Sequence, residues 1–443
     1  MSARRQRAAW LIFALALAFR LAFVVTLPDR LAWPDEREYV AIGHRLAAGQ
    51  GFVAESYRSA PVLPVYLGLV FRAFGESYLA ARIGQAVLGA LTCVLVYRAA
   101  SVLASPAVGA LTATLLAVYP PHIYLAGVFY TACLESFLCA SCVHLAARVL
   151  RARGGTGTAG LCGVALGLAV LTRPVLLALG PCMAAVWLWA VRPWRRTLAV
   201  CVALGLAAAA TVLPWSVRNL ATYGRFLLVS SGGGLTLWKG NNELADGTAD
   251  DRFLGWQREV WLARLERLSP AERAALVDKY ALVNERILAR EREVGDHYLA
   301  MDDVLGPVAR QYIAAEPART LLRSGRKVVT LFSAFSPTET AALPGPTALV
   351  AATTFYPLLL LAVLGAPLAF TREVGLALPY LVVISMAAVH ATLTSCTRFR
   401  LPVDPYVIMG ASFTVVEILG PRLIGRAAPE SAPNRPSVGR GAT

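Results

Sequence analysis

The chain has 443 residues, of which 57% are hydrophobic and 16% are charged, and it carries a formal net charge of +15. A soluble domain of this size needs more charge to cover its surface, so the composition excludes a soluble fold and indicates a membrane protein. The excess of Lys and Arg lies mostly in short segments between apolar runs, which is typical of membrane topology and not of a nucleic-acid interface. Nearly all of the eight cysteines lie inside apolar runs, so we expect buried thiols and no disulfide framework.

Apolar runs along the chain predict about ten transmembrane helices. The first, 9–27, follows a basic segment, and no signal-peptidase cleavage site comes after it. We therefore expect it to be a retained signal-anchor. The others are expected near 80–99, 108–119, 124–147, 159–171, 175–190, 198–213, 348–370, 375–393 and 401–419. Arg-rich segments flank alternate runs, which predicts a plasma-membrane protein with both termini and the Arg-rich loops in the cytoplasm, and with the other loops and the active site at the outer face.

These runs divide the chain into an N-terminal transmembrane module (1–213), an external, mainly helical region (214–344), a C-terminal transmembrane module (345–420) and a disordered cytoplasmic tail (421–443). In the external region, the segment from Ser269 to Glu272 has the pattern of a helix capping box. The run Gly232-Gly233-Gly234 could present backbone N–H groups to an anion. The predicted fold class is therefore all-α: a polytopic membrane protein with outer-face amphipathic helices and an external region.

The first outer loop, 28–79, places carboxylates beside the membrane. Pro34 marks the start of a helix, and the helix dipole favours Asp35 and Glu36 in its first turn. Tyr39 follows Asp35 by four residues and shares its helical face. This pattern fits either a solvated helix start or a catalytic carboxylate held at the bilayer surface.

A second carboxylate, Glu135, lies near the outer end of an otherwise apolar run. A carboxylate there carries an insertion penalty of kcal/mol size, so a function is the first hypothesis. The structural alternatives are an ion pair with Arg20 or Arg82, or a hydrogen bond to Tyr130.

Several cations are expected at the outer boundary, where a phosphate leaving group needs positive charge and fixed donors. Each could instead anchor the protein to lipid headgroups, and Arg400 is the strongest candidate because it opens the last span. The set is Arg218, Arg225, Lys239, Arg398 and Arg400.

An ordered series of motifs runs from Arg20 to about Leu419. Its pieces are Asp35-Glu36-x-x-Tyr39, Arg58-x-x-Pro61-x-x-Pro64, Ala81-Arg82-x-x-Gln85-Ala86, Tyr119-Pro120-Pro121 with Glu135, Leu171-Thr-Arg-Pro174, Pro214-Trp215-Ser-Val-Arg218-Asn219, Trp238-x-Gly240-Asn241-Asn242 and Arg398-Phe-Arg400-Leu-Pro402. Together they resemble the bacterial GT-C glycosyltransferases related to the dolichyl-phosphate-mannose protein mannosyltransferases (glycosyltransferase family 39). No piece is specific alone, but the ordered set is.

The resemblance implies a GT-C fold and a glycosyltransferase that takes a sugar from a polyprenyl-phosphate donor and passes it to a lipid, glycan or protein acceptor at the bilayer. It implies Asp35 as the catalytic base with Glu36 as the fallback, and Glu135 as a helper for the acceptor, the sugar or a metal. Single displacement with inversion of the anomeric carbon is expected. The substrate-binding residues are then Tyr39, Arg58, Arg82, Arg218, Lys239, Asn241, Arg398 and Arg400.

The family's acidic-plus-His metal set is not evident here, because His44, His122 and His390 are scattered along the chain. The metal ligands are therefore unknown, and a divalent cation stays open. The main alternative function is a multi-pass transporter or flippase of a lipid-linked substrate, with Arg20 and Glu135 in a polar pathway; a non-catalytic scaffold is a third. Charges that cluster at one face and not at the midplane favour the transferase.

Overall fold

The computed structural model describes residues 3–52, 59–152, 155–191, 193–246, 265–266, 268–334, 345–372 and 374–420. All regular elements within these residues are helices, which confirms the predicted all-α class. The predicted tail, 421–443, and the motif residue Arg58 lie outside the described residues.

The helices of the first half end with a 30-residue helix that contains Pro214. They are α1 (Ala3–Val24), α2 (Pro34–Ala47), α3 (Val62–Phe74), α4 (Tyr78–Leu103), α5 (Pro106–Val118), α6 (Pro120–Tyr124), α7 (Ala132–Arg151), α8 (Thr156–Thr172), the 3-10 segment η2 (Pro174–Ala178), α9 (Leu179–Ala190) and α10 (Trp194–Tyr223). The boundary expected at residue 213 thus falls inside α10, which is followed by Gly224, a residue in the left-handed conformation (φ 66°) that favours glycine.

The second half begins with short helices outside the apolar bundle and returns to it at α16. Its elements are α11 (Gly233–Gly240), α13 (Pro270–Val294), α14 (His297–Ala315), α15 (Pro317–Leu331), α16 (Gly345–Arg372), α17 (Val374–Thr392), the 3-10 segment η4 (Thr397–Val403), α18 (Asp404–Phe413) and the π-helical η5 (Thr414–Leu419). The predicted capping box opens α13, because Ser269 Oγ accepts from Glu272 N at 3.3 Å and Glu272 Oε2 accepts from Ser269 N at 3.0 Å.

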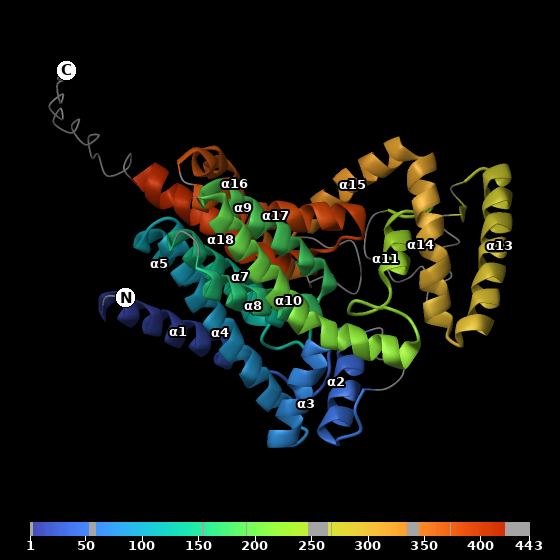
Figure 1. The fold of residues 1–443 in the computed structure, drawn as a ribbon, viewed down its shortest axis with the longest axis horizontal. Coiled ribbons are helices and arrows are strands. Elements are labelled where there is room, and N and C mark those ends of the chain that lie inside the picture. The colour runs from blue at the N-terminus through green and yellow to red at the C-terminus, as the bar shows by residue number, and fades with distance from the viewer. Residues whose placement is uncertain are drawn as a thin grey trace, which may run out of the picture.

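The long apolar helices form one bundle with two distinct ends (Figure 1). Helices α2 and α3 lie at one end together with α11, α13 and α14, whereas the start of α1 and the end of α18 lie at the other. Basic residues lie at the end of α7, where Arg148 and Arg151 are in the last turn, and at the start of α10, with Arg195 and Arg196.

Seven helices in the described part of the chain are long and apolar enough to span a membrane. They cover Ala3–Val24, Tyr78–Leu103, Ala132–Arg151, Trp194–Tyr223, Leu349–Thr371, Gly375–Thr392 and Thr397–Leu419. The other three predicted spans are shorter apolar helices, Pro106–Val118, Thr156–Thr172 and Pro174–Ala190. A fourth short apolar helix, α3, has no counterpart among the predicted spans and packs on α2.

Helices α8 and α10 approach closely because glycines lie between them. A Cβ atom at Gly163 would lie 2.3 Å from the carbonyl oxygen of Leu204, and one at Gly167 would lie 2.5 Å from Thr211 Cβ. The spacing Gly163-x-x-x-Gly167 is a small-residue stripe of the kind that lets helix backbones pack in lipid.

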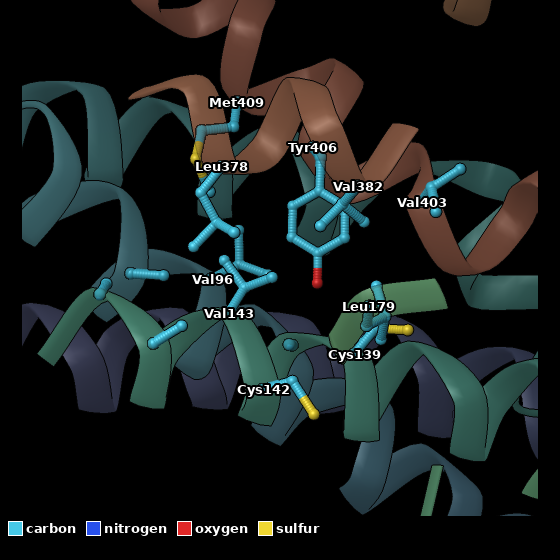
Figure 2. Packing of buried hydrophobic residues seen from close by; sticks show 14 of the residues in the cluster. Val96, Cys139, Cys142, Val143, Leu179, Leu378, Val382, Val403, Tyr406 and Met409 are labelled. Carbon is cyan, nitrogen blue, oxygen red and sulfur yellow. The ribbon is translucent and has the colours of Figure 1, made fainter. Parts of the chain in front are cut away.

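The centre of the bundle is filled by side chains from α4, α7, α9, α17 and α18. Figure 2 shows Tyr406 of α18 pointing toward Leu179 and Cys139 on the facing helices, with Val382 beside it. These residues belong to one continuous buried cluster. Trp10, Leu206 and Leu360 are instead more than half exposed on the outside, as a surface that faces lipid requires.

Candidate active site

Asp35 lies in the first turn of α2, at the end of the bundle where α7 begins and where η4 lies. Pro34 is the first helical residue, and the carboxylate of Asp35 is 47% exposed. Arg398 of η4 donates from Nη1 to Asp35 Oδ2 at 3.1 Å, and the Arg398 guanidinium carbon lies 5.0 Å from the centroid of the Tyr130 ring. The Asp35 carboxylate is therefore held on one side by a cation and open on the other.

The neighbouring Glu36 has the opposite environment. Its side chain is fully buried, and its Oε2 accepts hydrogen bonds from the backbone N–H groups of Ala32 at 2.7 Å and Trp33 at 2.8 Å. Its Oε1 accepts from the N–H of Phe129 at 2.8 Å. These three bonds fasten the first turn of α2 to the segment before α7, so Glu36 positions Asp35.

Tyr39 lies one helical turn after Asp35 and is partly buried. Burial, and next the carboxylates of Asp35 and Glu38, raise the pKa of the Tyr39 hydroxyl, against the opposing charges of Arg173 and Arg398. The hydroxyl therefore stays protonated at ordinary pH and can donate a hydrogen bond to a ligand beside Asp35.

The partner of Glu135 is Arg173, a residue that we did not predict as part of the site. Glu135 lies in the first turn of α7, and its Oε1 is 3.6 Å from Arg173 Nη1, beyond a hydrogen bond. Within the described residues this buried oxygen has no hydrogen-bond partner. Neither Arg20 nor Tyr130, two of the expected partners, bonds to it in that part of the chain.

Arg173 is placed by the break between α8 and η2, where its backbone is extended. Its guanidinium carbon lies 4.0 Å from the centroid of the Phe399 ring, and that ring also stacks on His390 with centroids 4.7 Å apart. Phe399 precedes Arg400 and follows Arg398, so η4 contacts both the Asp35 and the Glu135 parts of the site. The sequence signal that could have identified Arg173 is the Arg-Pro pair between two apolar runs.

Arg400, the cation that we expected most strongly at the phosphate, lies buried among partners of the protein itself. Its side chain is 1% exposed, and its Nε donates to Asp404 Oδ1 at 2.8 Å. Its Nη1 donates to the carbonyl of Ser333 at 3.1 Å, and its guanidinium carbon lies 3.5 Å from the centroid of the Phe355 ring. Asp404, which the sequence did not single out, also accepts from the Tyr119 hydroxyl at 3.2 Å. Arg400 is thus an internal cation that holds η4 against α15 and α16.

Arg82, also expected at the substrate, instead holds loop backbone. Its Nη1, Nη2 and Nε donate to the carbonyls of Pro28, Arg30 and Gly127 at 2.8, 2.9 and 3.1 Å. The side chain thereby connects the chain after α1 with the chain before α7. Like Glu36, Arg82 sets the position of the loop that carries Asp35.

The other predicted binding residues lie toward the external helices. Arg218 of α10 lies among aromatic rings, with its guanidinium carbon 4.8 Å from the centroid of Trp215, and donates to the Tyr223 hydroxyl at 2.8 Å. Asn241 is buried at the end of α11 and receives a hydrogen bond from Lys327 Nζ at 3.1 Å. Lys239 lies on α11 and is partly buried. In the described residues, no hydrogen bond joins Arg218 or Asn241 to Asp35 or Glu135.

The glycine run holds a carboxylate of the protein itself. Asp302 of α14 accepts from the N–H groups of Gly232 at 3.0 Å and Leu235 at 2.9 Å, and from Ser231 Oγ at 2.9 Å. The predicted anion cradle therefore exists, but it serves to fasten α14 to the start of α11.

An apolar groove of about 580 Å³ opens between α15, α16, α17 and α18. It is lined by Val328, Val329, Phe332, Ser333, Tyr356, Leu359, Ala362, Val363, Ala366, Tyr380, Val383, Ile384, Tyr406 and Val407. Ser333 connects the groove to the site, because its carbonyl accepts from Arg400 of η4 and from Thr397 Oγ1 at 3.2 Å.

For a metal, the described residues offer no group of three or more His, Cys, Asp or Glu side chains. His122 bonds to the carbonyl of Leu401 at 2.8 Å and His390 to that of Thr394 at 2.9 Å, so each has its own backbone partner.

The fold is the all-α, multi-pass fold of GT-C type. It matches the apo crystal structure of the Archaeoglobus fulgidus oligosaccharyltransferase with a TM-score of 0.57 and 14% identity, over 96% of this chain and 52% of that chain. It also matches the same organism's oligosaccharyltransferase AglB in complex with an inhibitory peptide and a dolichol-phosphate, with a TM-score of 0.57 and 15% identity, over 97% of this chain and 53% of that one.

The sequence matches agree with the predicted resemblance. Residues 58–216 match the family model described as dolichyl-phosphate-mannose-protein mannosyltransferase. The undecaprenyl phosphate-alpha-4-amino-4-deoxy-L-arabinose arabinosyl transferase of Edwardsiella ictaluri is 29% identical over 217 residues, which is 46% of this chain and 39% of that protein. The resemblance to this family is therefore confirmed, and the chain spans well under half the length of the curated relative.

Proposed function

We propose that this protein is a membrane glycosyltransferase that moves a sugar from a polyprenyl-phosphate donor to an acceptor at the outer face of the plasma membrane. The observation that carries the proposal is the half-exposed Asp35 carboxylate, fixed by Arg398 at the same end of an apolar bundle as the Glu135–Arg173 pair. The matches to a mannosyltransferase family and to an undecaprenyl-phosphate-dependent arabinosyl transferase support the same class of reaction.

In this mechanism Asp35 is the general base. Its open oxygen takes the proton of the acceptor group while the acceptor attacks the anomeric carbon, and the bond from that carbon to the phosphate oxygen breaks with inversion. Arg398 orients the carboxylate through the hydrogen bond to Asp35 Oδ2. The Tyr39 hydroxyl donates to the sugar, and Glu135 accepts from a sugar hydroxyl deeper in the site.

The apolar groove gives the donor's lipid a place beside this site. A polyprenyl chain needs an apolar channel that opens to the bilayer, and the groove is lined almost wholly by aliphatic and aromatic side chains. Its wall at Ser333 is hydrogen-bonded to η4, the segment that also carries Arg398. A donor with its chain in the groove would therefore have its phosphate end near η4.

The proposal is tested with purified full-length protein in detergent and a panel of radiolabelled polyprenyl-phosphate sugars, hexoses and 4-amino-4-deoxy-L-arabinose among them. Each donor is assayed for transfer or hydrolysis with and without a divalent ion. Turnover of one donor that is lost in Asp35→Asn supports the enzyme and names its sugar. A folded protein that neither turns over nor binds any donor contradicts the proposal and favours a transporter or flippase.

A further inference from the structure

We infer that Arg173 is the residue that binds the phosphate of the donor and receives its negative charge when the sugar leaves. The inference rests on the proposed function and adds to it a binding residue for the leaving group. A phosphate that departs from a sugar needs a cation with unused N–H donors, placed where the charge develops.

The guanidinium of Arg173 has such donors. It donates no hydrogen bond within the described residues, and its only ion-pair partner there, Glu135, is 3.6 Å away. The side chain is 23% exposed, and its contact with the Phe399 ring fixes the plane of the guanidinium. An arginine whose orientation is set by stacking, with its N–H groups unused, is prepared for a planar, two-oxygen ligand such as a phosphate.

Five other arginines near this end of the bundle already have partners within the protein. Each has N–H groups bonded to the protein's own carbonyl, carboxylate or hydroxyl oxygens: Arg20, Arg82, Arg218, Arg225 and Arg400. Arg398 donates to Asp35, so a phosphate bound there would compete with the base for the same guanidinium. Arg173 can bind a phosphate without disturbing that pair.

Arg398 and Arg173 serve the two opposite sides of an inverting displacement: Arg398 contacts the base, and Arg173 would bind the leaving phosphate. The base and the leaving group lie on opposite faces of the sugar ring, so the cation of each must be separate. Arg398 belongs to the base through Asp35, whereas Arg173 belongs to Glu135, and both guanidinium groups lie within 5.5 Å of the Phe399 ring centroid. A sugar between the two pairs would face the base on one side and Arg173 on the other.

Glu135 makes the subsite selective for a sugar phosphate over a simple anion. Its buried Oε1 has no hydrogen-bond donor in the described residues, and a buried acceptor without a donor is costly. A sugar hydroxyl or amine can supply that donor while the adjoining phosphate accepts from Arg173. In the transfer step the electron pair of the broken carbon–oxygen bond goes to the phosphate oxygen, which the Arg173 N–H groups face, and the acceptor proton goes to Asp35.

The test measures binding without catalysis. Radiolabelled undecaprenyl phosphate is titrated against the full-length protein in detergent for wild type, Arg173→Gln, Arg173→Lys and the control Arg319→Gln, an arginine whose side chain is 72% exposed. We expect Kd to rise about 10- to 100-fold in Arg173→Gln, since a charge-assisted pair is lost. Arg173→Lys should lie between this variant and wild type, and Arg319→Gln should equal wild type.

Competition identifies which part of the ligand Arg173 recognises. Undecaprenol, which lacks the phosphate, should compete equally well in wild type and Arg173→Gln, whereas inorganic phosphate should compete only weakly in both. Equal weakening of undecaprenol and undecaprenyl phosphate would mean a structural role and overturn the inference, as would unchanged undecaprenyl-phosphate binding in Arg173→Gln. A wild type that binds no undecaprenyl phosphate would instead contradict the proposed function itself.

Discussion

The hydrogen bond from Arg398 to Asp35 joins residues 363 positions apart in the chain. Asp35 opens α2 in the first loop, and Arg398 lies in η4, at the start of the last span. The orientation of the proposed base therefore depends on segments near the start and near the end of the chain. Arg400, two residues further on, holds η4 to α15, so the wall of the apolar groove and the base share one support.

Asp35→Asn should fold normally, bind undecaprenyl phosphate as wild type does, and lose about 10²- to 10⁴-fold in kcat, because an amide cannot act as a base. Steady-state transfer rates and a donor-binding titration check this. Glu36→Gln should lower activity through loss of stability, since it weakens backbone bonds under α2. Full activity in Asp35→Asn together with an inactive but stably folded Glu36→Gln would assign the base to Glu36.

Arg398→Gln should lower kcat by about 10-fold, because Asp35 loses the charged donor that orients it. Donor Kd should change less than twofold, since the phosphate is assigned to Arg173. Kinetics at saturating donor, combined with the binding titration, separate the two quantities. A large rise in Kd with an unchanged kcat would return Arg398 to the phosphate-binding role that the sequence first suggested.

Arg400→Met should destabilise the protein and leave donor affinity nearly unchanged in the fraction that folds. Removing one partner of a buried ion pair leaves Asp404 uncompensated, at a cost of about 3–5 kcal/mol. Thermal unfolding in detergent measures this loss. Asp404→Asn in the same background should recover part of the stability, because it removes the stranded charge.

Lys327 predicts a dependence of stability on pH. Its side chain is fully buried in α15, and burial, together with Arg323, lowers the pKa of Lys327 to about 7. The unfolded lysine keeps its proton up to about pH 10.4, so between these values the unfolded state binds more protons and stability rises with pH. Lys327→Met should remove that rise, which unfolding temperatures measured from pH 6 to 10 would detect; parallel curves for the two proteins would contradict it.

Ala366→Trp should fill part of the groove between α15 and α18. Ala366 lines the groove and is partly exposed, so the larger side chain can enter it without disturbing the core. We expect KM for an undecaprenyl-phosphate donor to rise several-fold, whereas a donor with a two-isoprene chain should be unaffected. Equal effects on both donors would place the lipid chain elsewhere.

Much of the architecture follows from the sequence because hydrophobic length and charge placement are local properties. The runs of apolar residues predicted the long helices of the bundle, seven of which in the described residues have the length and composition of a span. Ser269 and Glu272 likewise identified the start of α13, since a capping box involves residues only three apart. The carboxylates Asp35 and Glu135 were recognised because a charge beside or within an apolar run costs free energy and therefore indicates a function or a partner.

What each charge does was decided by the tertiary structure, because a partner far along the chain leaves no local signal. Asp35 and Glu36 are adjacent and chemically alike, yet one is half-exposed and the other is buried under three backbone N–H groups. Arg398 and Arg400 are two residues apart, but only the former reaches the site, because the 3-10 turn of η4 directs Arg400 toward Asp404. Arg173, hidden in a break between two apolar runs, becomes part of the site only when α7, α8 and η4 meet around Phe399.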